Sequence, residues 1–405
     1  MAICIKEALR LIASHVQKVS YEIVPIENSV DRICAENLYA KYPLPNYNNS
    51  AMDGYGIKLD DQSKKVKVVN TILAGSSIDT NVKIGEVVKI MTGAKVPESI
   101  EAIVPIEDVI VHNDNTITLP SNIKKNQHIR FCAEEIQIDD LLLKDGEDIN
   151  FASIALIASQ GITHIKVYRK PQISVFASGE ELKLHYEKIN QFQLYNSNTP
   201  TLLARAKELG GEAIFTGMAR DNIESLKEMI ENSLQSDFII TSGGISVGDA
   251  DFTREAFMQF DMEIIFDGIK IKPGKPTLFG KIGKTYILNL PGNPLAASLI
   301  FEIFGKAILQ KLSGNEKIYH SYILGKIGEE LPNKQGRTTL IPGNFDGEYF
   351  FPAPKRLPGM VGVLHNCNSM LILNKHQDLL KKESLVKILP INWKFFSNIQ
   401  KDFFS

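Results

Sequence analysis

Residues 241–253 read TSGGISVGDADFT, a combination of glycines, hydroxyls and acids that suits binding or catalysis. Ser246 stands in a G-x-S-x-G pattern, which α/β-hydrolases use for a nucleophilic serine at a strand-to-helix turn. Such a turn needs a helix directly at the serine, whereas Gly248, Asp249 and Ala250 intervene here. Glycine N–H groups also bind anions at close range. We therefore interpret the segment as an anion- and metal-binding loop and keep the hydrolase as an alternative.

The chain around this loop alternates predicted strands and helices, which is typical of a parallel, doubly wound sheet. Strands are predicted for PQISVFASG, for EAIFTG with its end at Thr216-Gly217, and for DFIITSGG, MEIIFDG and the run before LPGNP. Helices are predicted over 199–209, 222–235, 252–260 and 295–311. Ligands of such sheets bind beyond the carboxyl ends of the strands. The segments that follow these strands should therefore form one crevice.

The expected crevice collects groups that bind a metal ion and oxyanions. Carboxylates at several strand ends suit a hard cation such as Mg²⁺ holding phosphate, and lysines neutralise oxyanions as point charges. Taken singly, Asp221 and Asp251 could be helix caps, and Lys272 and Lys275 could be surface charges. The convergence of all of them favours a ligand site. The expected residues are Ser178, Gly179, Glu180, Glu181, Asp221, Ser242, Gly243, Gly244, Asp251, Lys272, Lys275, Pro291, Gly292, Asn293 and Pro294.

Composition and length indicate a folded protein of several domains. The chain has 405 residues, 44% of them hydrophobic and 23% charged, and a net charge of −2. A protein of this size exceeds one ordinary core, and the charge balance excludes sequence-independent nucleic-acid binding. The four cysteines are widely spaced and form no C-x-x-C, which argues against a disulfide framework or zinc site. With no signal-peptide or membrane-span pattern, we expect a cytoplasmic protein.

The remaining segments predict the domain organisation. Residues 3–18 and 149–160 have helical patterns, and 66–131 consist of short apolar runs separated by turn residues, which predicts a β-rich module. We expect an N-terminal region over 1–168, with helix, linker and a β-rich module at about 41–138. An α/β domain over 169–318, a small β-domain over 319–391 and a tail over 392–405 should follow.

One further string resembles the signature of a known family. Residues 43–57, PLPNYNNSAMDGYGI, are similar to the P-x-F-D-N-S-A-M-D-G-Y-A signature of the molybdopterin molybdenumtransferases, the MoeA family, which includes the C-terminal domain of gephyrin. Further matches follow in the family order: IMTGAKVP (90–97), SGEEL (178–182), SGGISVGDADFT (242–253), IKPGKPTLFG (271–280) and LPGNP (290–294). The SGG…GDAD part alone is also similar to the MogA-type molybdopterin adenylyltransferases.

The resemblance implies a fold and an activity. The fold would be an elongated homodimer with a MogA-like α/β domain, a β-rich module, a small mixed helical linker region and a C-terminal β-barrel. The activity would be insertion of molybdate into the dithiolene of adenylylated molybdopterin, with Mg²⁺-dependent release of AMP. A molybdopterin adenylyltransferase is a possible partner. Two alternatives stay open, a MogA-like adenylyltransferase that uses ATP and a non-catalytic scaffold dimer.

The resemblance also implies roles for individual residues. It carries catalytic acids onto Asp53, Glu180, Asp221 and Asp251, the last three as Mg²⁺ ligands, with Asp53 reaching the partner's α/β domain. The implied substrate-binding residues are Ser50, Thr92, Ser178, Gly179, Ser242, Gly243, Gly244, Ser246, Gly248, Asp249, Lys272, Lys275, Pro291, Gly292, Asn293, Pro294 and Arg337.

The chain departs from the family pattern at four places. Asn48 and Glu135 stand where the family usually has aspartates, Pro342 stands where it has an arginine, and Leu357-Pro358 stands where it has a small pair with serine. The last two departures leave open what the β-barrel contributes to the site, whereas the α/β segments are intact.

Overall fold

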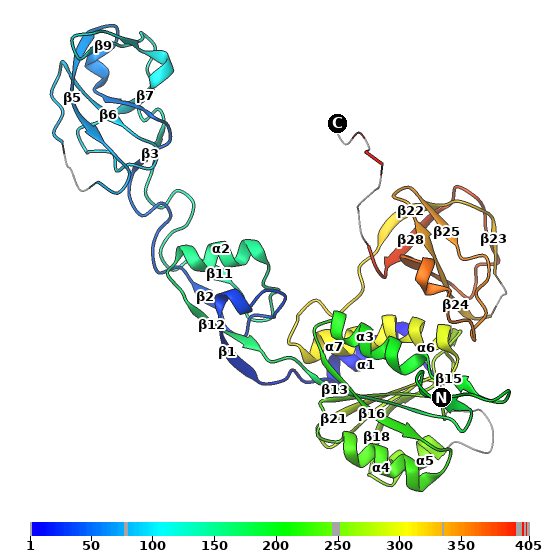
Figure 1. The fold of residues 1–405 in the computed structure, drawn as a ribbon. Helices are drawn as coiled ribbons and strands as arrows, with labels where there is room; N and C mark the ends of the chain where they lie inside the picture. The colour runs from blue at the N-terminus through cyan, green and yellow to red at the C-terminus, as the bar shows by residue number, and fades with distance from the viewer. Residues whose placement is uncertain are drawn as a thin grey trace. The chain divides into compact units, whose positions relative to one another are not determined.

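The computed structural model describes residues 2–76, 80–244, 252–333, 336–393, 399, 400 and 402. The chain divides into two compact units. The first unit contains Met1–Ala35, Asp145–Asn150 and His164–Ser405, and the second contains Glu36–Lys144 and Phe151–Thr163. The described helices include none with the length and apolar content needed to span a bilayer. As predicted, the chain is a mixed α/β protein with a doubly wound α/β domain, β-rich parts and a C-terminal β-barrel (Figure 1).

A six-stranded sheet forms the centre of the first unit. Its order is β16 (Glu212–Ala219), β13 (Gln172–Ser178), β17 (Phe238–Ser242), β21 (Thr285–Leu290), β20 (Leu278–Ile282) and β18 (Glu263–Asp267). Strands β16, β13, β17 and β21 are parallel, but β20 runs antiparallel to both of its neighbours. The prediction of a wholly parallel sheet is therefore wrong at β20. Only Gly283 and Lys284 join β20 to β21, which permits a hairpin but no crossover.

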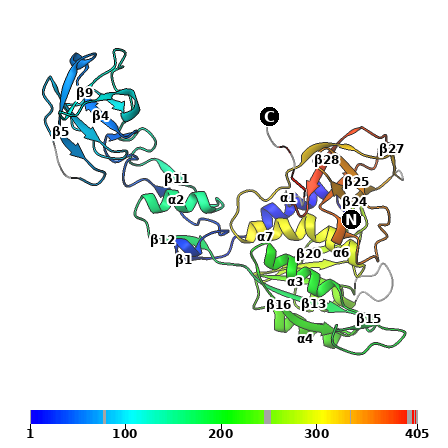
Figure 2. The same ribbon diagram turned by 45° about the horizontal axis from the view of Figure 1, so that its top comes forward.

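Helices cover both faces of this sheet. They are α1 (Ile5–His15), α3 (Asn198–Glu208), α4 (Ile223–Ser233), α5 (Phe252–Met258), α6 (Pro294–Ile300) and α7 (Lys306–Leu312), with a π-helical turn η4 (Phe301–Gly305) joining α6 to α7. Figures 1 and 2 show α4 and α5 on one face and α1, α3, α6 and α7 on the other. This arrangement is the doubly wound form that the alternation of strands and helices predicted.

The strand sequences explain why both faces are covered. In β17, Phe238 and Ile240 belong to one hydrophobic core, whereas Ile239 between them belongs to the other. Strand β21 follows the same rule, with Leu288 in the first core and Ile287 in the second. Successive side chains of a strand point to opposite faces, so a continuous apolar run requires packing on both sides.

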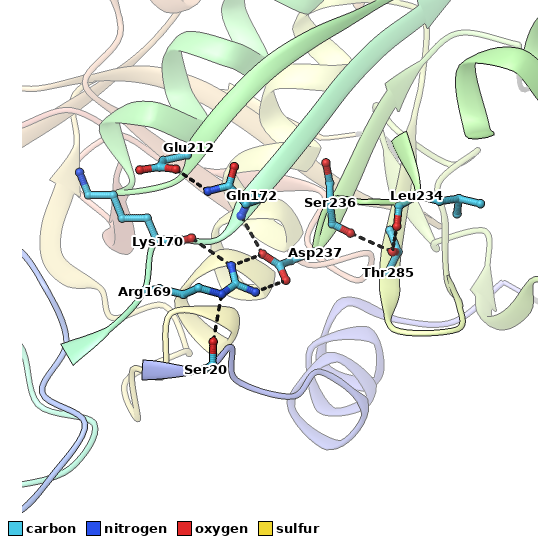
Figure 3. A network of polar contacts seen from close by, with 9 residues as sticks. All are labelled: Ser20, Arg169, Lys170, Gln172, Glu212, Leu234, Ser236, Asp237 and Thr285. Carbon is cyan, nitrogen blue, oxygen red and sulfur yellow. Dashed lines mark hydrogen bonds and ion pairs between the residues drawn. The ribbon is translucent and has the colours of Figure 1, made fainter. Parts of the chain in front are cut away.

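A network of polar contacts occupies the amino edge of the sheet (Figure 3). The guanidinium of Arg169 binds both carboxylate oxygens of Asp237 at 2.6 Å, and the backbone N–H of Gln172 donates to Asp237 Oδ2 at 2.8 Å. Asp237 precedes β17 and Gln172 begins β13. The pair also raises the pKa of Arg169, chiefly through the hydrogen bond to Asp237. The network therefore holds the starts of two central strands together, at the edge opposite their carboxyl ends.

The C-terminal part of the first unit is a closed β-barrel. Its strands are β22 (Ile323–Ile327), β24 (Thr338–Phe345), β25 (Tyr349–Pro352), β26 (Ser369–Leu373) and β28 (Leu385–Pro390). The pairing of β24 with β26 closes the ring of five strands. β19 (Ile271–Lys272) pairs with β24, so a segment of the α/β domain extends the barrel sheet. The first unit also contains the antiparallel ribbon of β1 (Tyr21–Pro25) and β12 (His164–Tyr168) and the short pair β23 (Leu331–Pro332) and β27 (Leu379–Leu380).

The second unit is the β-rich module, and its described residues include the α-helix α2 (Phe151–Ser159). Its main sheet has the order β7 (Ala102–Pro105), β4 (Gly54–Ile57), β6 (Glu86–Ile90), β5 (Lys65–Ile72), β9 (Thr116–Thr118) and β8 (Ile110–Val111). Two short pairs are added, β3 (Asn49–Ser50) with β10 (Ile129–Arg130), and β2 (Leu38–Tyr39) with β11 (Leu141–Leu143). Hydrophobic residues on both faces of the main sheet form two small cores.

A buried ion pair joins two helices of the first unit. Arg205 of α3 binds Glu302 of η4 through two hydrogen bonds of 2.6 and 2.9 Å. The same guanidinium donates to the backbone oxygen of Ile391, which follows the last barrel strand, at 2.8 Å. The side chain of Glu302 is only 6% exposed, whereas Glu208, the second carboxylate near Arg205, is 63% exposed. The Glu302 contact is therefore the one that compensates for burial of the arginine.

Replacing Glu302 should destabilise the protein far more than replacing Glu208. Glu302→Ala leaves Arg205 partly buried without its main partner, and we expect a loss of about 3 kcal/mol in the free energy of unfolding. Glu208→Ala removes an exposed pair and should cost less than about 1 kcal/mol. Urea unfolding followed by circular dichroism compares the two variants. Equal losses would show that the buried pair has no special role.

Candidate active site at the carboxyl edge of the sheet

A cavity of about 790 Å³ lies where β13, β17 and β21 end. The sequence analysis expected a crevice at this edge. The cavity is lined by Ser178, Gly179, Glu181, Leu182, Leu194, Tyr195, Asn196, Ser197, Asn198, Asp221, Ser242, Gly243, Gly244, Phe252, Gly292, Asn293, Pro294, Gly359 and Val361. The structure thus brings together these expected residues: Ser178, Gly179, Glu181, Asp221, Ser242, Gly243, Gly244, Gly292, Asn293 and Pro294. Pro291 follows β21 directly, and its backbone oxygen accepts from Ser242 Oγ at 3.2 Å.

Asp221 lines the cavity just beyond the end of β16, a strand that is longer than the sequence predicted. Strand β16 runs to Ala219 instead of ending at Thr216-Gly217. Its register against β13 shifts at this point, with Val175 opposite Phe215 and Phe176 opposite Gly217. Thr216 is thus the extra residue of a β-bulge, and a bulge lets a strand continue with a local bend. Asp221 consequently lies two residues beyond the strand end.

Asp221 is not the cap of helix α4, contrary to one sequence interpretation. The N-cap is Asn222, whose side-chain oxygen accepts from the backbone N–H of Ser225 at 2.9 Å. The Asp221 carboxylate instead lies beside the next loop, with Oδ2 at 3.4 Å from the backbone nitrogen of Glu180. Glu180 itself is exposed. Two of the expected metal ligands are therefore adjacent in space, although they are 41 residues apart in sequence.

Four residues of the expected site belong to the segment between Gly244 and Phe252. Ser246, Gly248, Asp249 and Asp251 lie outside the described residues. Among the residues that are described, no group of three histidines, cysteines or acids has the arrangement of a metal site. The carboxylates of Glu180 and Asp221 have the ligand chemistry that Mg²⁺ prefers, so the described part fits this ion as two of its ligands.

The loop after β17 requires glycine at two positions. Gly243 and Gly244 have φ values of +97° and +66°, a region that favours glycine. A Cβ at Gly244 would lie 1.9 Å from Thr253 Oγ1 and 2.6 Å from Ser178 Oγ. Both of those hydroxyls are buried and have no hydrogen-bond partner among the described residues. A side chain at position 244 would therefore collide with both hydroxyls, which explains why glycine stands there.

The sequence analysis missed Asn198, the first residue of α3. Its side-chain Nδ2 donates to Ser242 Oγ at 2.6 Å and to the backbone oxygen of Gly292 at 2.8 Å. The preceding residues Asn196 and Ser197 also line the cavity. The signal was the run Asn196-Ser197-Asn198 before a predicted helix, because a helix that starts at the carboxyl edge brings its first residues to the crevice. Reading only strand ends overlooks such residues.

The expected cations lie at the same edge of the sheet but not among the lining residues. β18 runs parallel to β21, because each is antiparallel to β20, so the segment after Asp267 with Lys275 belongs to the crevice edge. Lys272 in β19 lies opposite Thr339 of β24, which brings it near Arg337 at the start of that strand. All three cationic side chains are exposed. The pairing of β19 with β24 thus brings together the segments of Lys272 and Arg337, which are 65 residues apart in the sequence.

The barrel contributes one segment to the cavity. Gly359 and Val361 line it, and the backbone oxygen of Pro358 accepts from the N–H of Leu295 in α6 at 3.0 Å. The departure at Leu357-Pro358 therefore lies beside the site. Pro342 is buried in the barrel wall, where it pairs with Met370, and it is not a lining residue.

A second cluster lies in the second unit, around Asp53. Asp53 Oδ1 accepts from the backbone N–H of Thr92 at 2.7 Å and from its hydroxyl at 2.8 Å. These two hydrogen bonds, the backbone bond first, hold the pKa of Asp53 below its usual value. Ser50 joins the cluster because its backbone oxygen accepts from Gly93, the residue after Thr92, at 2.8 Å. The structure thus gathers Ser50, Asp53 and Thr92, which the sequence analysis selected.

The two departures in this unit lie next to each other. Asn48 Oδ1 accepts from the backbone N–H of Cys132 at 2.8 Å. The backbone N–H of Glu135, in the same loop, donates to Leu44 at 3.0 Å. An aspartate would accept the Cys132 hydrogen bond equally well, so asparagine at position 48 preserves this connection. Glu135 is exposed.

Thr92→Val should raise the pKa of Asp53 toward the ordinary value of an aspartate. The variant keeps the backbone donor but loses the hydroxyl, and hydrogen bonds to the charged form lower a carboxyl pKa. Thr92→Ser keeps a hydroxyl and should leave the pKa low. Titration of the Asp53 carboxyl carbon by NMR measures both variants. An unchanged pKa in Thr92→Val would show that the backbone hydrogen bond alone sets it.

Comparisons with known proteins agree with this architecture. Residues 3–161 match the family described as MoeA N-terminal region (domain I and II), and residues 174–311 match the family described as probable molybdopterin binding domain. A molybdopterin molybdenumtransferase of Haemophilus influenzae is 36% identical over 390 residues, covering 92% of this chain and 94% of its own. One of Staphylococcus epidermidis is 30% identical over 383 residues, covering 92% and 91%. A crystal structure of the molybdopterin biosynthesis MoeA protein from Pyrococcus horikosii superposes with a TM-score of 0.82 and 28% identity, covering 97% of this chain and 100% of that one.

The fold and the family matches define a multidomain transferase of molybdenum cofactor biosynthesis. The chain belongs to the molybdopterin molybdenumtransferase family, the MoeA family. The resemblance recognised in the sequence is thereby confirmed. The MogA-like adenylyltransferase and scaffold alternatives do not fit, because the relatives that match along nearly the whole chain are molybdenumtransferases.

Proposed function

We propose that this protein inserts molybdate into the dithiolene of adenylylated molybdopterin, with Mg²⁺-dependent release of AMP. The observation that carries the proposal is the cavity of about 790 Å³ at the carboxyl edge, which is lined by glycines, serines, asparagines and the acids Glu181 and Asp221. Small-molecule sites in proteins occupy roughly 300–1,000 Å³. The cavity is therefore large enough for a nucleotide-sized ligand, and its lining matches a phosphate.

The carboxylates and the glycine loops have separate roles in this proposal. Glu180 and Asp221, with Asp251 assigned from the sequence, would hold Mg²⁺. When bound, Mg²⁺ neutralises the charge that develops on the phosphate oxygens as the adenylyl bond breaks. Ser178, Gly243 and Gly244 line the same cavity, and main-chain groups of this glycine loop would orient the phosphate by hydrogen bonding. Holding both reactants in one geometry lowers the barrier, because a bimolecular encounter becomes effectively unimolecular.

Exposed cations outside the cavity lining suit the second substrate. Molybdate is a tetrahedral oxyanion, and Lys275 after β18, with Lys272 and Arg337 where β19 pairs with the barrel strand β24, would provide positive charge for it. Their exposure allows an anion to reach them from solvent. In this proposal the cations bind molybdate beside the dithiolene, whereas the glycine loops bind the adenylyl phosphate.

The proposal includes a cytoplasmic homodimer with composite sites. Asp53 is an exposed carboxylate whose pKa is lowered by Thr92, so it is ionised at neutral pH. The family resemblance assigns Asp53 of one copy to the crevice of the other copy. Closed two-fold dimers contain two such sites, each built from both subunits. A molybdopterin adenylyltransferase is a possible supplier of the adenylylated substrate.

The proposed reaction has a direct test. Purified protein is incubated with adenylylated molybdopterin, Mg²⁺ and molybdate, and AMP is measured by chromatography. AMP release that requires molybdate supports the proposal. Consumption of ATP with free molybdopterin, without AMP release from the adenylylated form, would overturn it in favour of the adenylyltransferase.

Subunit mixing tests the composite site. Asp53→Ala and Asp221→Ala homodimers should each be inactive, because every site lacks one acid. After subunit exchange, half of the dimers are mixed and one of their two sites contains both acids. AMP release should then return to about a quarter of the wild-type specific activity. Exchange is verified with two affinity tags, and mixed dimers without activity would exclude the shared site.

Two variants of the loop distinguish the binding loop from a hydrolase elbow. Asp251→Ala should nearly abolish turnover by removing a metal ligand, whereas Ser246→Ala should lower it only modestly. A fluorophosphonate probe should not label Ser246. The two variants are compared on the same preparation after circular dichroism confirms folding, since loss of a helix cap costs only about 1 kcal/mol. Covalent labelling, or a more damaging loss at Ser246, would favour the serine nucleophile.

A further inference from the structure

Three segments that line the cavity meet at one side chain, Asn198. The end of β17 contributes Ser242, and the segment after β21 contributes Gly292. Asn198 Nδ2 lies 2.6 Å from Ser242 Oγ and 2.8 Å from the backbone oxygen of Gly292. Neighbouring strands of the sheet place the two segments side by side, and the hydrogen bond from the N–H of Gly243 to the backbone oxygen of Leu290, at 3.2 Å, is the last main-chain contact between them in the described part of the chain. The asparagine therefore continues the connection into the two loops.

The orientation of this amide follows from its partners. A backbone oxygen such as that of Gly292 can only accept a hydrogen bond. Ser242 Oγ donates its single hydrogen to the backbone oxygen of Pro291 at 3.2 Å, so it accepts from Asn198. Both partners need a donor, and the amide NH₂ group supplies two. An aspartate at position 198 would present acceptor oxygens to two acceptors.

We propose that Asn198 is a positioning residue that fixes the distance between the loop with Gly243-Gly244 and the loop with Gly292-Asn293. Asn198 acts through Ser242 and Gly292 on the backbone groups that face the ligand. The ends of the glycine loops lie close together, since a Cβ added at Gly292 would be 3.5 Å from the Cα of Gly243. A shared ligand in contact with both loops depends on this spacing. The effect on ligand binding rests on the proposed function, but the effect on the loops does not.

Hydrogen exchange of the two loops tests the proposal without any ligand. In Asn198→Ala, the amides of Gly243, Gly244 and Gly292 should exchange at least several-fold faster than in the wild type, whereas the amides of β13 and β17 should be unchanged. Asn344→Ala is the matched control, because Asn344 is exposed on β24 and does not line the cavity. Unchanged exchange in both loops of a folded Asn198→Ala protein would overturn the proposal.

Titration with AMP and Mg²⁺ by calorimetry provides the second readout. We expect about a tenfold weaker AMP affinity in Asn198→Ala, which corresponds to loss of one or two net hydrogen bonds. The double variant with Ser242→Ala should be less than additive, because both changes break the same connection. An additive double variant would show that Asn198 does not act through Ser242. If the wild type binds no AMP, the proposed function fails, and hydrogen exchange still decides the role of Asn198.

The variant Asn198→Asp adds a signature that general destabilisation would not produce. An ionised aspartate has no donor, but a protonated one regains a single O–H donor. The AMP affinity of Asn198→Asp relative to the wild type should therefore improve as the pH falls through the pKa of the new carboxyl group. The same ratio for Asn198→Ala should not change with pH. Parallel pH profiles of the two variants would contradict the donor role.

Discussion

Burial of both faces of the central strands is the constraint on which the rest of the first unit depends. Ile239 of β17 faces one core and its neighbours Phe238 and Ile240 face the other, so apolar side chains fill both sides of this strand. The few polar residues inside the strands, such as Ser174 and Thr241, are fully buried, and the clusters of accessible polar groups described above lie at the two edges of the sheet. At the amino edge, Arg169 and Asp237 bind each other and the start of β13. The carboxyl edge is the one that contains the cavity.

Close packing at the carboxyl edge explains why its loops consist of small residues. Gly244 lies against two buried hydroxyls, Thr253 Oγ1 and Ser178 Oγ, with no space for a Cβ. The same absence of side chains exposes backbone N–H groups to a ligand. Loops of this kind have few side-chain contacts of their own to hold them. Hydrogen bonds from a neighbouring helix, such as those of Asn198, are therefore a physical means of fixing their geometry.

The departures from the family pattern differ in their consequences. Asn48 keeps the hydrogen bond to Cys132 that an aspartate could accept, so the local structure does not depend on the change. At Leu357-Pro358 the main chain, not a side chain, contacts the α/β domain through the oxygen of Pro358. A backbone contact tolerates many side chains. Pro342 is buried in the barrel wall, where an arginine would carry a charge that burial disfavours.

The sequence by itself determined the alternation of strands and helices, the edge of the sheet at which the cavity lies and about half of the lining residues. These features depend on apolar periodicity and on short motifs such as SGG and LPGNP, which are local in the chain. The sequence also contains the two-residue connection Gly283-Lys284, which makes β20 antiparallel to β21. Apolar periodicity alone did not predict β20 as a strand distinct from β21.

Only the tertiary structure decided which of the candidate side chains meet. It showed that Asn222 caps α4 in place of Asp221, that Asn198 connects two loops, and that Lys272 lies at the junction with the barrel strand β24. These outcomes depend on distances between segments that are far apart in sequence and on the directions of individual side chains. Neither quantity has a periodic or local signal in the sequence, because both are set by packing of the complete fold.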